Sequence, residues 1–187
     1  MEKLKIGLLV GSLRKESFNL KTAKALMSIA PRSLDLELVD ISKLQFFNQD
    51  LEEQPTAEWE EFRRNIKSLD GVIFLTPEYN RSVPGVLKNA IDVGSRPYGQ
   101  SVWDSKPAAI VSVTPGNLGG FGANHHLRQS LVFLNMPTMA QPEAYISGAS
   151  KLFDDTGTLT NDSTKEFLTK FMTAFESWVL LTRQSKN

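Results

Sequence analysis

The chain has 187 residues, and its 21 basic side chains balance its 21 acidic ones, so its formal net charge is zero. A chain without net charge has no overall field to attract a polyanion, so we expect no nucleic acid as its partner. The absence of cysteine excludes disulfides, a cysteine nucleophile and a thiolate zinc site. The longest apolar runs, such as Val72–Leu75, are four residues, far below the roughly 20 that a membrane helix needs. With no signal-peptide pattern before the first strand, we expect one globular, cytoplasmic domain over residues 1–187.

Apolar runs and helical repeats alternate along the chain. Strand patterns occur over residues 5–11, 34–41, 71–76, 107–114 and 138–146, and helical patterns over residues 20–30, 57–69, 84–93, 121–134 and 163–182. Gly71–Thr76 is apolar toward both faces, as a central parallel strand must be. The alternation predicts a parallel sheet with helices on both faces. Five strands favour the order 2-1-3-4-5 of a flavodoxin-like three-layer α/β sandwich, since a barrel needs eight strands.

The last helical pattern, over residues 163–182, is the clearest. Its apolar side chains recur at steps of three and four, which is typical of a helix that packs on a sheet. They are Phe167, Leu168, Phe171, Phe175, Trp178 and Val179. Ser163 and Glu166 match a capping box, which predicts that the helix begins there.

The predicted sheet also indicates where a ligand binds. In an open parallel sheet, ligands bind beyond the carboxyl ends of the strands, near the switch point between the first and third strands. Three loops follow strands in this region, after Val10, Leu75 and Val113. We therefore expect the binding site where these loops meet.

The first loop, residues 11–19, leaves a strand and opens a helix. It has neither the Gly-x-Gly-x-x-Gly spacing of a dinucleotide site nor the Gly-Lys-Ser/Thr ending of a nucleoside-triphosphate loop. Ser12, Ser17 and Asn19 offer hydroxyl and amide groups beside the helix N-terminus, and Arg14 offers a guanidinium. These donors suit a phosphate monoester. The same serines and asparagine also suit an ordinary helix cap, and both interpretations remain open from the local sequence.

The other two loops differ in character from the first. The second loop, residues 76–85, is stiffened by two prolines and carries Tyr79 and Asn80. An aromatic ring and an amide at a strand end suit a planar heterocycle, although an ordinary proline-rich turn has the same composition. The third loop, residues 114–122, has four glycines in seven residues. Glycine allows a ligand to approach the backbone closely, and a flexible connection is the alternative.

Other kinds of site have weaker support. His125 and His126 are adjacent, so on a helix they point about 100° apart and do not share one metal ion by their spacing. We expect no metal site and name no catalytic residue, with a histidine general base as the alternative. A serine hydrolase is disfavoured because the chain lacks a Gly-x-Ser-x-Gly elbow.

Taken together, the loops resemble those of the NADPH-dependent FMN reductase family, and most closely its branch of quinone, chromate and azo-dye reductases. The resemblance depends on residues 11–19 as the phosphate loop, on Pro77-Glu78-Tyr79-Asn80 with Ser82 and Pro84-Gly85, and on Leu87–Asp92, Gly116-x-x-Gly119-Gly120 and the tail over residues 159–179. These motifs follow one another over nearly the whole chain. The resemblance implies a flavodoxin-like fold and an FMN cofactor.

Site residues follow from the same resemblance. In the first loop it implies cofactor-binding residues Ser12, Arg14, Ser17, Phe18 and Asn19, of which the four polar ones would hold the FMN phosphate. In the second loop it implies Pro77, Glu78, Tyr79, Asn80 and Ser82, which would line the isoalloxazine largely through their backbone. In the third loop it implies Gly116, Gly119 and Gly120, which would approach the ring from its other side.

The resemblance further implies an enzyme that passes hydride from NADPH or NADH to FMN and then electrons to small-molecule acceptors. The flavin supplies this chemistry, which agrees with a site without cysteine or an acid-base pair. Arg81 and Arg96 are candidates for contact with the 2′-phosphate of NADPH. Two alternatives are a flavodoxin-type electron carrier, which the neutral charge disfavours, and a flavin-free α/β ligand-binding module.

Assembly is the last expectation. The resemblance implies a homodimer or homotetramer, with the flavin near a subunit boundary. The segment over residues 95–105 has no clear element, yet it contains Tyr98 and Trp103. Exposed apolar side chains often mark an interface, so we expect this segment and the helix over residues 84–93 in the subunit contact. The alternative is that both aromatic rings pack against their own sheet.

Overall fold

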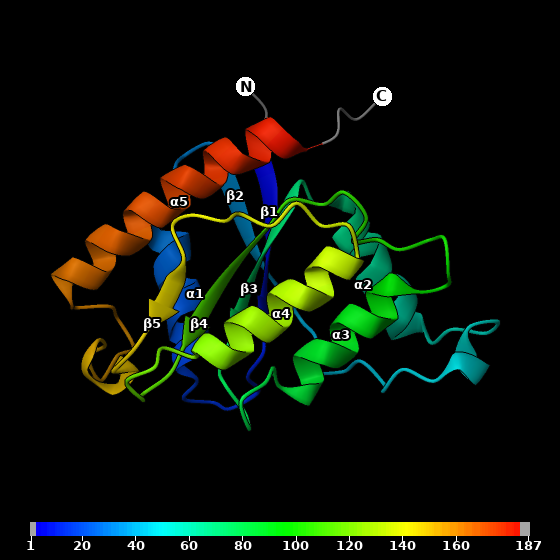
Figure 1. Ribbon diagram of the computed structural model, residues 1–187, viewed down its shortest axis with the longest axis horizontal. Helices are drawn as coiled ribbons and strands as arrows, with labels where there is room; N and C mark the ends of the chain where they lie inside the picture. Colours follow the sequence, from blue (N-terminus) through cyan, green and yellow to red (C-terminus); the bar gives the residue numbers. More distant parts are fainter. Residues whose placement is uncertain (1–2, 184–187) are drawn as a thin grey trace.

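The computed structural model describes residues 3–183 and contains a five-stranded parallel sheet. Its order is β2-β1-β3-β4-β5, and every neighbouring pair is parallel, as the sequence predicts. The strands are β1 (Leu4–Val10), β2 (Leu34–Val39), β3 (Gly71–Thr76), β4 (Ala108–Val113) and β5 (Ala144–Ile146). The predicted flavodoxin-like strand order is therefore confirmed (Figure 1).

Helices cover both faces of the sheet and complete three layers (Figure 1). One face is covered by α1 (Phe18–Ile29) and α5 (Asp162–Thr182). The other face is covered by α2 (Ala57–Ser68), α3 (Gly85–Ser95) and α4 (Phe121–Phe133). Two short 3-10 helices, η1 (Gln49–Leu51) and η2 (Ala149–Lys151), lie in the connections.

The central strand β3 shows why the sheet needs both helical layers. Its side chains alternate between the two hydrophobic cores, with Ile73 and Leu75 facing α1 and α5, and Val72 and Phe74 facing the other three helices. All four are fully buried. Burial of apolar surface on both faces is the main favourable contribution to folding, and it explains the unbroken apolar run.

Two predictions about the C-terminal part of the chain are wrong in detail. The last strand has only three residues, because residues 138–143 contribute a single bridge, between Thr138 and Ala108; within this stretch Pro142 has no N–H to donate to a ladder. The capping box is also wrong. Asn161 caps α5, its Oδ1 accepting from the amide of Thr164 at 2.9 Å. Asparagine is as good a cap as serine, and Glu166 instead pairs with Lys170 at 2.7 Å.

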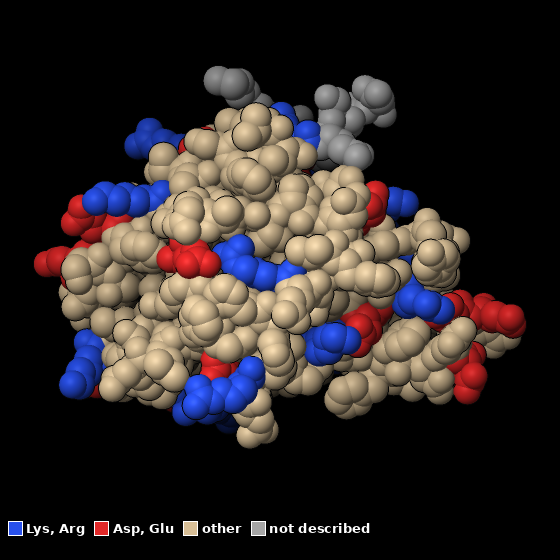
Figure 2. Space-filling model, viewed as in Figure 1, with Lys and Arg blue, Asp and Glu red and all other residues tan. Residues whose placement is uncertain are grey.

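Charged side chains are unevenly distributed over the molecular surface. Figure 2 shows that the surface over α4 is formed mainly by uncharged side chains. Phe133, at the end of α4, is 86% exposed. No helix in the described part of the chain is long and apolar enough to cross a membrane.

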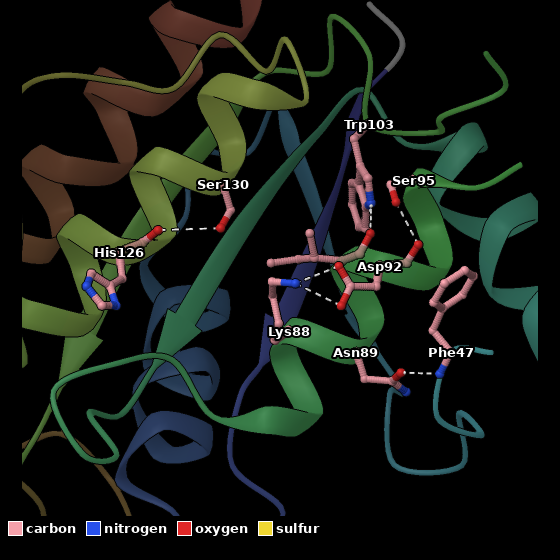
Figure 3. Close-up of polar contacts among 9 residues, drawn as sticks. Phe47, Lys88, Asn89, Asp92, Ser95, Trp103, His126 and Ser130 are labelled. Carbon is pink, nitrogen blue, oxygen red and sulfur yellow. Dashed lines mark hydrogen bonds and ion pairs between the residues drawn. The ribbon is translucent and has the colours of Figure 1, made fainter. Parts of the chain in front are cut away.

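Trp103 lies inside its own domain and not on the surface. It is 0% exposed, and its indole N–H donates to the carbonyl of Ile91 on α3 at 2.9 Å (Figure 3). The ring packs against Gly94, where a Cβ atom would lie 2.4 Å from the indole nitrogen. The expectation that Trp103 contributes to a subunit contact is therefore wrong, since the helix leaves a ring-sized space there. Tyr98, in contrast, is 86% exposed.

Candidate functional site

The three loops singled out in the sequence meet at one edge of the sheet. Val10 of β1 pairs with Leu75 of β3, and Thr76 of β3 pairs with Ser112 of β4. The amide of Gly11 also donates to the carbonyl of Leu75 at 2.8 Å. The three carboxyl ends are therefore neighbours, at the lower edge of the sheet in Figure 1.

The first loop places donors at the N-terminus of α1. Ser17 caps the helix, its Oγ accepting from the amide of Leu20 at 3.2 Å. Amides in the first turn of a helix have no partner within it, and the helix dipole makes this end positive. In the same loop, Ser12 is half-buried and Arg14 is exposed. One amino group of Arg14 donates to the carbonyl of Glu16 at 2.6 Å, which leaves its other N–H groups for a ligand.

Phe18 and Asn19 support the first loop from within. Asn19 is buried, and its Nδ2 donates to the carbonyl of Val113 at 3.3 Å, which ties the loop to the end of β4. Its Oδ1 has no partner among the described residues. Phe18 stacks on Phe153, with the guanidinium of Arg14 over its ring. The side chains of Ser17 and Asn19 thus brace the loop, while Ser12, Arg14 and the helix amides are the accessible donors.

The second loop contains a tight two-residue turn. Tyr79 and Ser82 exchange two backbone hydrogen bonds of 3.0 Å each. Between them, Asn80 and Arg81 both have positive φ, 52° and 65°, a left-handed conformation that is rare for residues other than glycine. Such strain persists only where the surroundings enforce it, and it concentrates at functional sites. The turn leaves Tyr79 half exposed.

Two side chains of the second loop reach α4. Glu78 Oε2 accepts from the amide of Ala123 at 3.1 Å. Ser82 Oγ lies 3.0 Å from His126 Nδ1. Both contacts tie the second loop to the helix that follows the third loop.

The glycines of the third loop serve two purposes. Gly119 and Gly120 have φ values of 61° and 73° and are buried. A Cβ atom would lie 2.7 Å from Tyr145 at the first position and 2.9 Å from Ser112 at the second. Packing therefore requires both glycines. Gly116 is exposed and has no side chain, so a ligand can approach it closely. Its amide donates to Thr114 Oγ1 at 3.2 Å, and its carbonyl accepts from the amide of Gly148 at 3.3 Å.

Sequence reasoning missed two buried polar residues that hold the third loop. Ser112 Oγ donates to the carbonyl of Gly119 at 2.6 Å and accepts from Nδ2 of Asn124 at 3.3 Å. Both polar side chains are fully buried. Buried polar groups are almost always hydrogen-bonded. A serine in an apolar strand and an asparagine on the inner face of a helix could therefore have indicated these contacts from the sequence.

The motif that follows the second loop positions α3. The side chain of Asn89 is buried, and its Oδ1 accepts from the amide of Phe47 at 2.7 Å (Figure 3). Lys88 forms a surface ion pair with Asp92, one turn along the helix, at 2.7 Å (Figure 3). Asn89 therefore anchors the segment after β2 to α3.

Each histidine has a different protein partner. His126 contacts Ser82, and His125 Nε2 lies 2.9 Å from the hydroxyl of Tyr145. Burial, with the nearby carboxylate of Glu143, raises the pKa of Tyr145 to about 12. Across residues 3–183 no cluster of acidic, histidine or cysteine side chains could hold a metal ion.

The two arginines considered for the 2′-phosphate are not equivalent. Arg96 lies at the far end of α3 from the second loop and pairs with Glu52 at 2.6 Å. An 11-residue helix is about 16 Å long, so Arg96 is remote from the three loops. Arg81 lies in the second loop. Its side chain is 77% exposed, and its Nη1 lies 3.7 Å from Oε1 of Glu78.

This arrangement defines a class: an α/β protein of the flavodoxin-like type, with hydrogen-bond donors and a helix N-terminus at the switch point. Residues 4–151 match the family described as NADPH-dependent FMN reductase. A quinone reductase of Pseudomonas putida is 60% identical over 179 residues, which are 95% of this chain and 96% of that protein. The quinone reductase of Escherichia coli K12 is 39% identical over 183 residues, 95% of this chain and 96% of its own length.

A solved structure agrees with these sequence relatives. FerB, a flavoenzyme NAD(P)H:(acceptor) oxidoreductase from Paracoccus denitrificans, superposes with a TM-score of 0.91 at 37% identity, over 97% of this chain and 100% of FerB. The chain belongs to the NADPH-dependent FMN reductase family. It is an oxidoreductase with FMN as cofactor and NAD(P)H as co-substrate.

The donors of the first loop fit a phosphomonoester such as that of FMN. The single carboxylate within the loop, Glu16, is paired with Lys21 at 2.9 Å, so its charge is offset. Arg14, Ser12 and the first amides of α1 supply charged and neutral donors in one place. Anions are stabilised by such helix N-termini, and the loop has no second anchor for a pyrophosphate.

Proposed function

We propose that this protein is an FMN-dependent NAD(P)H:quinone oxidoreductase. Held by the first loop, FMN would supply the redox chemistry, which is hydride transfer from NAD(P)H followed by electron transfer to the acceptor. One observation carries the proposal: the first loop, with its hydrogen-bond donors, lies beside the second and third loops at one edge of the sheet. Relatives support the acceptor class, since they include quinone reductases and a 2-hydroxy-1,4-benzoquinone reductase of a Burkholderia species at 43% identity.

The site residues have distinct proposed roles. Ser12, Arg14 and the N-terminal amides of α1 hold the phosphate, with Ser17, Phe18 and Asn19 shaping the loop. The ring would be flanked by exposed or half-buried residues, namely Pro77, Tyr79, Asn80 and Gly116. Glu78, Ser82, Gly119 and Gly120 act on the ring site through their packing. Arg81 is the proposed contact for the 2′-phosphate of NADPH.

Apolar side chains around the three loops favour a planar, apolar acceptor. Leu13 of the first loop, Tyr79 of the second and Leu118 of the third are exposed, as is Phe121 at the start of α4. Such side chains favour contact with an aromatic ring over water. We propose that quinones and azo dyes use the same face of the site as NAD(P)H, in turn. Chromate, a tetrahedral oxyanion, would use that face without this apolar contact. The expected kinetics are ping-pong.

The described helices suggest that the whole chain acts as one domain. The last helix, α5, buries Phe171 and Phe175 in the same core as α1 and β3. We therefore propose that residues 1–187 form a single FMN-binding domain.

We also propose that the protein is cytoplasmic, because an enzyme that uses NAD(P)H must be in the compartment that contains this co-substrate.

We also propose a homodimer or homotetramer whose contact includes the surface over α4 and the segment after α3. Tyr98 and Phe133 are largely exposed there, and Figure 2 shows few charges over α4. The segment and the end of α4 are neighbours, since the amide of Ser105 donates to the carbonyl of Asn135 at 3.0 Å. Exposed apolar surface of this kind marks interfaces.

A spectrum and a kinetic assay test the function. The purified protein should show flavin absorbance with one FMN per chain and should prefer FMN to FAD. With NADPH and a quinone, double-reciprocal plots should give parallel lines. Intersecting lines would contradict ping-pong kinetics. A protein that holds FMN but does not oxidise NADPH would be an electron carrier, and one that stays colourless with FMN would not be a flavoprotein.

A further inference from the structure

Helix α4 begins without a cap of its own. The residue at its N-cap position, Gly120, has no side chain to accept a hydrogen bond, and the first turn of the helix contains no acidic residue. Gly119 and Gly120 both adopt positive φ just before the helix. Such a start leaves amide groups without partners and the positive end of the helix dipole without a compensating charge.

Glu78 supplies the missing cap from another loop. Its Oε2 accepts from the amide of Ala123, the third residue of α4, at 3.1 Å. An N-cap side chain of the helix itself would bind an amide at this position. The Glu78 side chain is only 15% exposed, and a carboxylate beside a helix N-terminus is favourable. Glu78, which lies 45 residues before Ala123 in the chain, therefore caps α4 in place of a residue of the helix itself.

The sequence of α4 leaves room for this carboxylate. A Cβ atom at Gly122 would lie 3.0 Å from Glu78 Oε2 and 3.0 Å from the carbonyl of Arg81. Glycine is unfavourable in a helix, so its presence in the first turn agrees with a close approach of the second loop. This is a separate observation from the hydrogen bond, and it points to the same contact.

The second loop holds α4 at a second point. Ser82 contacts His126 at 3.0 Å, three residues and nearly one turn beyond Ala123. The backbone bonds between Tyr79 and Ser82 make the intervening turn stiff. Because α4 starts where the third loop ends, these contacts set the position of the third loop relative to the second.

We propose that Glu78 is a positioning residue that fixes the two loops on either side of the flavin ring by capping α4. The inference rests on the proposal that these loops hold FMN. The side chain of Glu78 acts through α4 and makes no contact with FMN or substrate. The acceptor oxygen at this point is the part of the side chain that this role requires, and the negative charge adds a smaller contribution through the helix dipole.

Amide hydrogen exchange in the FMN-free, full-length protein tests the cap directly. In Glu78→Ala, the amides of residues 121–124 should exchange about tenfold faster, because the lost bond frees the first turn. FMN should bind about fivefold to tenfold more weakly, and the visible circular dichroism of the bound flavin should change. In Glu78→Gln, which keeps an acceptor oxygen, all three readouts should return close to the wild-type values.

Two further variants make the experiment specific. Glu166→Ala removes an exposed carboxylate that pairs with Lys170 on α5, and it should change none of these readouts. Gly122→Ala introduces a Cβ atom 3.0 Å from Glu78 Oε2 and 3.0 Å from the carbonyl of Arg81, so the second loop must shift slightly. This variant should weaken FMN binding in the presence of Glu78. In the Glu78→Ala background the same change should have a smaller effect, because contacting residues are not additive.

The outcomes separate the inference from the proposed function. Faster exchange and weaker FMN binding in Glu78→Ala, both restored by glutamine, support the inference. It is overturned if Glu78→Gln behaves like Glu78→Ala, if exchange is unchanged in Glu78→Ala, or if exchange rises without any effect on FMN. If Glu78→Ala does not fold, the single variants decide. Wild-type exchange in Glu78→Gln, with faster exchange of residues 121–124 and weaker FMN binding in Gly122→Ala, supports the inference, and wild-type exchange in Gly122→Ala overturns it. Exchange in the FMN-free protein tests the cap whether or not quinones are the acceptors.

Discussion

Ser82 Oγ and His126 Nδ1 lie 3.0 Å apart, so the second loop and α4 share a hydrogen bond across 44 residues of sequence. The imidazole of His126 thus has a structural partner on the loop that is proposed to flank the flavin. His125, the next residue, turns instead to the hydroxyl of Tyr145. Neither contact requires the histidine to transfer a proton during turnover.

Replacement of either histidine should therefore have a modest kinetic effect. In His126→Ala and His125→Ala, the rate at which NADPH bleaches the flavin absorbance should stay within about tenfold of wild type, whereas a true acid-base residue contributes about 10²–10⁴-fold. Stopped-flow absorbance measures this rate. A thousandfold drop in one variant would identify that histidine as a general acid or base.

Arg14 should bind the phosphate of FMN directly. Its guanidinium is exposed and uses one donor on the carbonyl of Glu16. In Arg14→Ala, FMN binding should weaken by about 1.5–3 kcal/mol, the range for a hydrogen bond to a charged group. Riboflavin, which lacks the phosphate, should bind almost unchanged. Flavin fluorescence titration measures both affinities.

Lys15→Ala is the matched control, since Lys15 is an exposed neighbouring cation without a partner among the described residues. It should cost FMN binding at most about 1 kcal/mol, as is typical of a solvated charge. Equal losses for FMN and riboflavin in Arg14→Ala would show that Arg14 acts by shaping the loop.

The hydroxyl of Tyr145 should lose its proton at a higher pH than an ordinary tyrosine does. Burial and the carboxylate of Glu143 raise its pKa from 10.0 to about 12. One of the three tyrosines should therefore ionise near pH 12 in the folded protein, as measured by phenolate absorbance. Tyr145→Phe should remove that late step. Glu143→Gln should lower its midpoint only in part, because burial, the largest single cause of the raised pKa, remains.

The same shift predicts how stability depends on pH. Between pH 10 and about 12 the unfolded chain has lost the Tyr145 proton while the folded protein retains it. The free energy of unfolding should therefore fall as pH rises through this range, by at most roughly 2–3 kcal/mol from this group. Below pH 10 the group has no such effect. Denaturant titrations of wild type and Tyr145→Phe measure the difference, and identical slopes would contradict the assignment.

The assembly should be sensitive to the surface over α4. Light scattering of the FMN-bound protein at micromolar concentration should give a multiple of 20.9 kDa. Phe133→Glu should lower that mass, because a charge on an apolar interface must be desolvated. Met27→Glu, on α1 at the opposite face of the sheet, is the control and should leave the mass unchanged. A wild-type mass near 20.9 kDa would contradict the proposed oligomer.

Local patterns were sufficient for the secondary structure and for the place of the site. The apolar run Gly71–Thr76 predicted β3 with the correct bounds, because a strand buried on both faces leaves no alternation to misread. The ends of helices were harder to predict from local patterns. The start of α5 depends on which of several polar side chains accepts a hydrogen bond from a first-turn amide, and this residue is Asn161 and not Ser163.

Contacts between distant residues could not be predicted in this way. Trp103 looked like a surface ring because its segment has no periodic pattern, yet Gly94 provides the space that buries it. Gly119 and Gly120 suggested ligand contact, while their packing against Tyr145 and Ser112 already requires glycine. In each case the deciding neighbour belongs to another element.

Sequence patterns were enough to predict the alternation of strands and helices, the parallel sheet and the three loops at its carboxyl edge. They were enough because periodic burial of apolar side chains is a local property. Three features could be seen only in the packed structure: the side chain that caps α4, the arginine that lies beside the loops and the aromatic ring that is buried. These depend on how the layers close over one another, and the contact between Glu78 and Ala123 exists only once β3 and α4 have packed together.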